Sequence, residues 1–197
     1  MRVVTLGEPS GAAAQPLFVE FVNTLHWYEG APIELIGTEA ELTTWLAEHA
    51  LATDALTNCL PALHRLRDHA RAATEALARG STPAETDVTA IGEALRRPTG
   101  HLALVDDAAP APAARLAFAT DASTADLLAF QVALSFVTFL EFGDRRRLKL
   151  CANPGCGFAF LDTSTNATRR WCYMRYCGNR LKARAFRRRG RDAANAT

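Results

Sequence analysis

The sequence lacks both a secretory leader and an uninterrupted apolar run of membrane-spanning length. Loop-forming residues 7–10 follow the short Val3–Leu6 run at once, whereas a leader passes from charged to apolar to small residues. The longest apolar run, Leu127–Phe142, contains polar residues and is shorter than the about 20 residues that a bilayer requires. We therefore expect a cytoplasmic protein without membrane association, in which this run is a core helix.

Catalytic signatures are also absent. His64 and His69 are five residues apart, so they do not share a helix face as an i, i+4 metal-binding pair does. No recognisable acid–base constellation is formed by the five histidines, His26, His49, His64, His69 and His101. Most of them are expected to be packing or surface residues, and the chain is expected not to be an enzyme.

Charge divides the chain into two parts. With 197 residues, 49% of them hydrophobic, the chain can bury a core in one or two domains. The net charge of +1 hides fourteen Lys/Arg against three Asp/Glu in residues 144–197, and eight against eighteen in residues 1–143. This asymmetry predicts an acidic domain over 1–143 and a basic domain over 144–197.

The apolar spacing predicts an α+β fold, mainly α, in which a helical N-terminal domain carries a small β-hairpin. The hairpin is expected from His101–Val105 and Arg115–Ala119. Helices are expected over Leu17–Trp27, from the Thr38/Glu41 capping box to about His49, over Thr53–Arg79 with Pro61 as a kink or boundary, over Ala84–Arg96, and over Thr124–Phe142 behind Ser123 as N-cap.

Four of the five cysteines form two equally spaced pairs. Cys151, Cys156, Cys172 and Cys177 make a C-x4-C-x15-C-x4-C array. Reduced thiolates favour metal ligation over disulfides, and four thiolates at about 2.3 Å are the usual closed structural zinc site. We predict one structural Zn²⁺ in a treble-clef-like finger with the order knuckle, hairpin, knuckle and helix. An iron–sulfur cluster, two disulfides or plain core cysteines are the alternatives, and the unpaired Cys59 is expected in the core.

Basic residues follow the last cysteine without interleaved acids. On a helix that persists through Gly190, the side chains of Arg180, Arg184, Arg187 and Arg191 fall within about 60° of one another. Such a stripe binds phosphates with salt-dependent affinity, and guanidinium groups can read guanine edges in the major groove. Predicted nucleic-acid contacts are these four residues with Arg169, Arg170, Lys182 and Arg188. A merely solvated basic face is the alternative.

Four segments closely resemble the CGNR zinc-finger family: Leu150–Cys156, Phe160–Ser164, Arg169–Met174 and Cys177–Arg184. Phe21–Leu25 and the helix after it are similar to the opening of the ABATE domain that usually precedes that finger. The resemblance implies zinc on the four cysteines, DNA contact through the finger and a sensor domain, as in stress-induced transcription regulators. Thr165 departs from the pattern, because relatives often have an arginine there.

We therefore expect a zinc-binding and DNA-binding transcription regulator whose N-terminal domain senses a small molecule or a stress signal. Asn23, a polar residue within an apolar helix, is expected either to line the ligand pocket or to be a satisfied buried amide. A single finger reads few base pairs, so a homodimer is expected. The alternatives are an RNA-binding or ribosome-associated protein and a protein-interaction module with a purely structural zinc. Oxidation of the thiolates would make the zinc site redox-sensitive.

Overall fold

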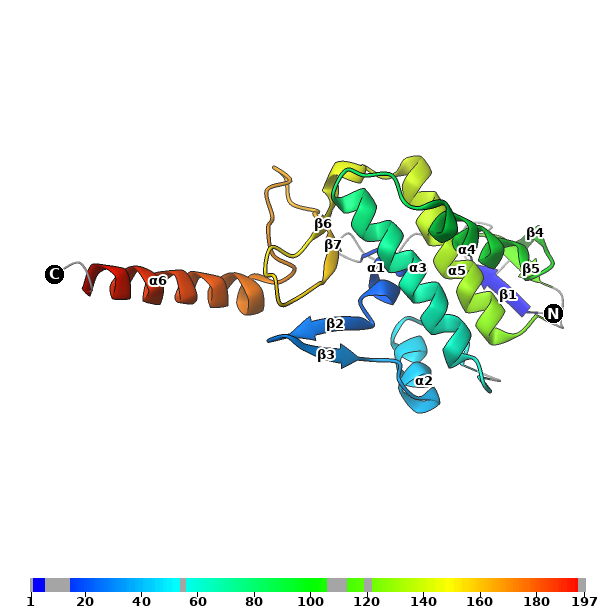
Figure 1. Cartoon of the computed structure of the whole chain (residues 1–197). Helices are drawn as coiled ribbons and strands as arrows, with labels where there is room; N and C mark the ends of the chain where they lie inside the picture. Colours follow the sequence, from blue (N-terminus) through cyan, green and yellow to red (C-terminus); the bar gives the residue numbers. More distant parts are fainter. Residues whose placement is uncertain (1, 6–14, 54–55, 106–112, 119–121, 195–197) are drawn as a thin grey trace.

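Helices dominate the structure, as the apolar spacing predicts. The computed structural model describes residues 2–5, 15–53, 56–105, 113–118 and 122–194. Its helices are α1 (Leu17–Val22), α2 (Glu39–Glu48), α3 (Leu60–Ala78), α4 (Glu85–Arg96), α5 (Thr124–Phe142) and α6 (Asn179–Ala194), with a 3₁₀ turn η1 (Arg145–Arg147) and a π-helical turn η2 (Met174–Gly178). Figure 1 shows α1, α3, α4 and α5 gathered in one body, from which α6 extends away.

Three small antiparallel sheets accompany these helices. The strands β1 (Arg2–Thr5), β5 (Ala113–Phe118) and β4 (Gly100–Val105) lie side by side in that order, β2 (Leu25–Tyr28) pairs with β3 (Ala31–Glu34), and β6 (Leu148–Leu150) pairs with β7 (Ala159–Leu161). The predicted hairpin of β4 and β5 is confirmed, and its tip at 106–112 lies outside the described residues. The α+β, mainly α fold is confirmed, but β1 and the β2–β3 hairpin were not predicted.

Capping side chains and a proline set three helix boundaries. The Thr38 hydroxyl accepts the Glu41 N–H and the Glu41 carboxylate accepts the Thr38 N–H, which confirms the capping box at the start of α2. Ser123 likewise accepts the Asp126 N–H and caps α5. The third helix begins at Leu60 rather than Thr53, because Pro61 occupies the first turn, where its missing N–H costs nothing.

The helix predicted over Leu17–Trp27 ends at Val22, so that prediction is wrong beyond this residue. Leu25–Tyr28 instead pair with Ala31–Glu34 across a two-residue turn. Glu29 and Gly30 adopt φ of 56° and 87° in that turn. Positive φ at both central residues is what a tight hairpin of the usual twist requires.

A continuous hydrophobic core joins the helical body to the first strands of the finger. The Phe18 ring packs against Phe136 and Phe139, with ring centroids 5.1 and 5.4 Å apart. Leu148 of β6 and Ala159 of β7 belong to the same buried cluster. Folding of the cysteine-rich region is therefore linked to packing of the N-terminal helices.

The apolar helix α5 is only partly enclosed. Leu128, Val132 and Phe136 face the core, whereas Phe142 is 83% exposed. The whole helix is long and apolar enough to cross a membrane by length and composition, so the expectation that it is too short is corrected. Its role as a core helix follows instead from packing against α1 and α4.

Candidate metal centre and nucleic-acid interface

The first cysteine pair forms the tip of the β6–β7 hairpin. The Cys151 N–H donates to the Phe158 carbonyl at 2.8 Å, and the Cys156 N–H donates to the Asn153 carbonyl at 3.0 Å. The strands therefore flank this first knuckle. The hairpin was expected between the two knuckles, where the structure has an irregular segment over residues 162–173.

The second pair spans η2: Cys172 precedes this turn, and Cys177 lies near its end, where it runs into α6. The Cys177 N–H donates to the Tyr173 carbonyl at 3.0 Å, which closes the wide turn. A Cβ at Gly178 would collide with the Met174 side chain and lie 3.3 Å from the Trp171 ring. Only glycine fits after Cys177 without displacing these neighbours, so the turn can bring Cys177 beside Cys172.

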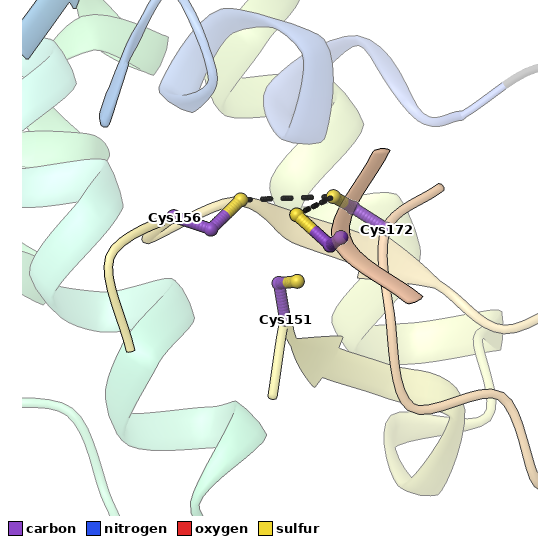
Figure 2. A group of neighbouring side chains, drawn as sticks. Cys151, Cys156 and Cys172 are labelled. Carbon is purple, nitrogen blue, oxygen red and sulfur yellow. Dashed lines mark hydrogen bonds between the residues drawn. The ribbon is translucent and has the colours of Figure 1, made fainter. Parts of the chain in front are cut away.

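All four sulfur atoms lie within 4.8 Å of one another, and the four cysteines are buried. The Cys172 sulfur is 3.6 Å from that of Cys156 and 3.7 Å from that of Cys177. Figure 2 shows the sulfur atoms of Cys151, Cys156 and Cys172 pointing into a common space. A tetrahedral zinc ion with bonds of about 2.3 Å requires sulfur–sulfur separations of about 3.8 Å. The cluster therefore fits one structural zinc ion.

Electrostatics also favour a cation at this cluster. Sulfur atoms this close cannot all be thiolates unless a positive charge balances them. The hydrogen bond shared with Cys151 raises the pKa of Cys156 to about 12. The Asn153 amide donates to the Cys177 sulfur at 3.4 Å, which gives that buried sulfur a hydrogen-bond partner.

Asn23 clamps the finger to the helical body. Its side-chain amide donates to the Ala159 carbonyl at 2.8 Å and accepts the Ala159 N–H at 2.9 Å, so it pairs with β7 as a neighbouring strand would. Gln15 pairs in the same way with Leu161. Both polar atoms of Asn23 are used in this clamp, and the side chain is buried. Of the two interpretations of Asn23, these bonds match the satisfied buried amide.

Replacing Asn23 by alanine should therefore weaken the attachment of the finger to the helical body. N23A leaves a buried N–H and a buried carbonyl of Ala159 unpaired, and each unsatisfied group costs about 1–3 kcal/mol. The expected loss is about 3 kcal/mol in the free energy of unfolding, measured by denaturant titration of the zinc-loaded protein. The matched variant Q15A should cost less, because the half-buried Leu161 can exchange its partner for water. Equal losses for both variants would contradict this assignment.

Arg71 and Gly157 form a second contact between the finger and the helical body. The buried Arg71 guanidinium, on α3, donates to the Gly157 carbonyl at 2.9 Å and to the carbonyls of Val22 and Leu25. Gly157 has a φ of +63°, and a Cβ there would lie 2.6 Å from the Trp27 ring. One cation thus ties the first knuckle to the end of α1 and the start of β2.

Asp162 organises the loop between the knuckles. Its buried carboxylate accepts the Lys149 ammonium at 2.7 Å, the Ser164 N–H at 2.9 Å and the Arg169 N–H at 2.8 Å. Burial alone would raise the pKa of Asp162, but these hydrogen bonds lower it well below its usual range. This role of Asp162 was not predicted, although the residue lies in the family-like segment Phe160–Ser164.

The variant D162N should destabilise the finger in a pH-dependent manner. At pH 7 we expect a loss of about 2 kcal/mol, since hydrogen bonds to a charged group are worth about 1.5–3 kcal/mol. Because the pKa of Asp162 is lower in the folded than in the unfolded protein, its contribution to stability is fully present above the unfolded pKa of about 3.9. This contribution is lost as the pH falls below that value. The difference in unfolding free energy between D162N and the natural protein should therefore stay nearly constant from about pH 7 to about pH 5 and shrink as the pH falls below about 4. A difference that does not shrink below about pH 4 would refute the assignment, and D144N, at an exposed ion pair, is the control.

Two of the predicted nucleic-acid contacts are engaged within the protein. Arg169 donates to the Trp171 carbonyl at 2.9 Å, and its guanidinium lies over the Phe160 ring. The Arg180 guanidinium lies 4.4 Å from the centroid of the Tyr28 ring, hydrogen-bonds to the Tyr28 hydroxyl and forms an ion pair with Glu29 at 3.3 Å. Arg180 thus docks the start of α6 on the β2–β3 hairpin.

The other predicted contacts remain open to solvent wherever their side chains are described. Arg170, Lys182, Arg184 and Arg187 are exposed, as are Arg175 and Arg189, which were not predicted. Arg188 and Arg191 lie in α6, which continues past Gly190 as expected. Beyond its docked first turn, the helix therefore offers solvent-exposed cations on more than one face.

Each histidine whose side chain is described contacts a different partner. His26, His49 and His64 each contact a backbone carbonyl, and His69 pairs with Asp87 at 2.9 Å. These four side chains form no shared site, and the side chain of His101 lies outside the described set.

Fold and site together define a zinc-finger protein in which a cysteine knuckle, clamped on a helical body, leads into a projecting basic helix. The CGNR zinc finger family model matches residues 147–190. The ABATE family model, described as "Putative stress-induced transcription regulator", matches residues 15–141. The chain belongs to the ABATE family and carries a CGNR zinc finger after the ABATE region. No curated protein matches the chain.

Proposed function

We propose that the protein is a zinc-dependent DNA-binding transcription regulator of the cytoplasm. The observation that carries this proposal is the projection of α6 from the body (Figure 1), together with the exposed basic side chains of that helix. Sixteen helical residues span about 24 Å, and a helix fits the major groove of about 12 Å width. Lys182, Arg184, Arg187 and Arg189 supply phosphate contacts, and the guanidinium groups of the three arginines can also bind guanine edges.

The helical body acts as a sensor in this proposal. The Asn23, Arg71 and Arg180 contacts link the finger to the ABATE region at separate points, so a change in packing of that region alters how α6 is held. A single projecting helix covers few base pairs, so the operator-bound form is a homodimer.

Selection from random duplex oligonucleotides with the zinc-loaded full chain tests the DNA-binding role. We expect enrichment of a short motif and binding that weakens steeply with salt. A competing structured RNA distinguishes the main alternative, because α6 could bind phosphates of either polymer. Absence of any enriched motif together with preferential displacement by RNA would overturn the proposal in favour of RNA binding.

A further inference from the structure

A cavity of about 260 Å³ lies between the β2–β3 hairpin and the two cysteine knuckles. Aromatic side chains from three segments form its walls: Trp27 and Tyr28 from the hairpin, Phe158 after the first knuckle, and Tyr173 and Tyr176 from the second. Drug-sized ligands occupy cavities of about 300 Å³ or more. This cavity therefore suits a smaller planar molecule of one or two rings.

Three of the four zinc-binding residues, Cys156, Cys172 and Cys177, line the same cavity. Each is at most 7% exposed, so the protein shields them from bulk solvent. A molecule held between the aromatic walls lies directly against these residues. Thiolates are strong nucleophiles, so the cavity combines a binding surface for flat rings with a reactive group.

We propose that this cavity admits small neutral electrophiles of the quinone class and delivers them to the zinc-binding thiolates. Aromatic walls stabilise a flat conjugated ring by stacking. They offer no comparable advantage to a small polar oxidant such as a peroxide. Glu29 and Arg180 both line the cavity and form an ion pair with each other at 3.3 Å, so together they add no net charge to its wall. Shape and apolarity favour a neutral ring, because a charged compound would lose its hydration on entering.

The reaction is a conjugate addition and requires no further oxidant. A thiolate sulfur forms a bond to a ring carbon, and the electron pair of the attacked double bond moves to a quinone oxygen, which takes a proton from water. Loss of the proton on the attacked carbon and protonation of the second oxygen give a hydroquinone thioether. A neutral thioether is a weaker zinc ligand than a thiolate, so the modified site releases its metal.

The structural consequence reaches α6 directly. Cys172 and Cys177 hold the second knuckle, and α6 begins two residues after Cys177. Release of zinc removes the anchor of this helix, while the Arg180 contact with Tyr28 and Glu29 is left as a single attachment. Only the expected loss of DNA binding rests on the proposed function, whereas the cavity chemistry is independent of it.

The test treats the zinc-loaded full chain with 1,4-naphthoquinone and follows adducts by peptide mass mapping and zinc release with a chromogenic chelator. We expect adducts on Cys156, Cys172 or Cys177, zinc release at the same rate, and a rate that saturates with quinone concentration. To correct for intrinsic reactivity, the rate of each quinone with the protein is divided by its rate with N-acetylcysteine. After this correction, the 2-sulfonate derivative should react at least about tenfold more slowly than 1,4-naphthoquinone. Non-electrophilic 2-naphthol should slow the reaction by competition.

Two aromatic variants provide the matched comparison. Tyr176 lines the cavity, whereas Phe186 is an exposed aromatic residue on α6 outside it. Y176A should lower the normalised rate several-fold and F186A should leave it unchanged. The proposal is overturned if adducts form first on Cys59, or if the rate rises linearly without protection by 2-naphthol. No DNA enters the experiment, so its failure is distinguishable from a failure of the DNA-binding role.

Discussion

Replacing Cys177 by serine is expected to abolish stoichiometric zinc binding and, with it, the fold of the finger. Structural zinc sites contribute about 10–16 kcal/mol at pH 7. One thiolate of four thus accounts for on the order of 4 kcal/mol, roughly a thousandfold in affinity. The serine hydroxyl is not ionised at this pH, and the Asn153 amide loses its sulfur acceptor.

The loss should spread beyond the metal centre. Leu148 and Ala159 lie in the same core cluster as Phe18 and Phe136, so an unfolded finger exposes part of that core. We expect a lower melting temperature and rapid amide hydrogen exchange over residues 148–178, with most helical circular dichroism retained.

Zinc content per chain by atomic emission is the primary measurement for C177S. The control is C59S, at a buried cysteine whose sulfur donates to the Leu56 carbonyl at 3.2 Å, away from the cluster. C59S should keep one zinc per chain. Full zinc occupancy in C177S after dialysis against a competing chelator would contradict the assignment of Cys177 as a ligand.

The sequence was most informative where the determinant is local. The Thr38/Glu41 capping box and Ser123 act over three residues, and each cysteine pair closes over five. The structure has α2, α5 and the metal cluster where these signals indicate. A hydrogen bond between residues three apart is encoded in the sequence itself. No distant partner has to be known.

Prediction failed where a distant partner decides the conformation. Apolar spacing continues past Val22, but Asn23 binds Ala159, 136 residues away, and Leu25–Tyr28 form a strand. Arg180 and Arg184 belong to the same basic run, yet only Arg180 meets Tyr28 and Glu29. A pattern of basic residues cannot separate docked from free cations, because the hairpin that captures Arg180 lies about 150 positions earlier.

The second large effect is expected on DNA affinity and its salt dependence, and it depends on which cations of α6 are exposed. Combined replacement of Lys182, Arg184 and Arg187 by alanine removes three exposed charges from α6. Each neutralised phosphate contributes about 0.9 to the slope of log affinity against log salt. The triple variant should therefore lose nearly 3 from that slope and on the order of 100-fold in affinity at physiological salt, for all duplex sequences alike.

R180A is the informative counterpart, because it removes the same kind of charge from the same helix. The Arg180 side chain is only 21% exposed and already paired with Glu29, so few counterions are released when it approaches DNA. R180A should leave the salt slope nearly unchanged but lower the melting temperature, since α6 loses its contact with the hairpin. Fluorescence anisotropy titrations at several salt concentrations, with R146A as a charge-removal control outside α6, give the slopes. If R180A lowers the slope as much per charge as the triple variant, then Arg180 leaves the hairpin to bind phosphate, and the first turn of α6 belongs to the DNA-binding surface.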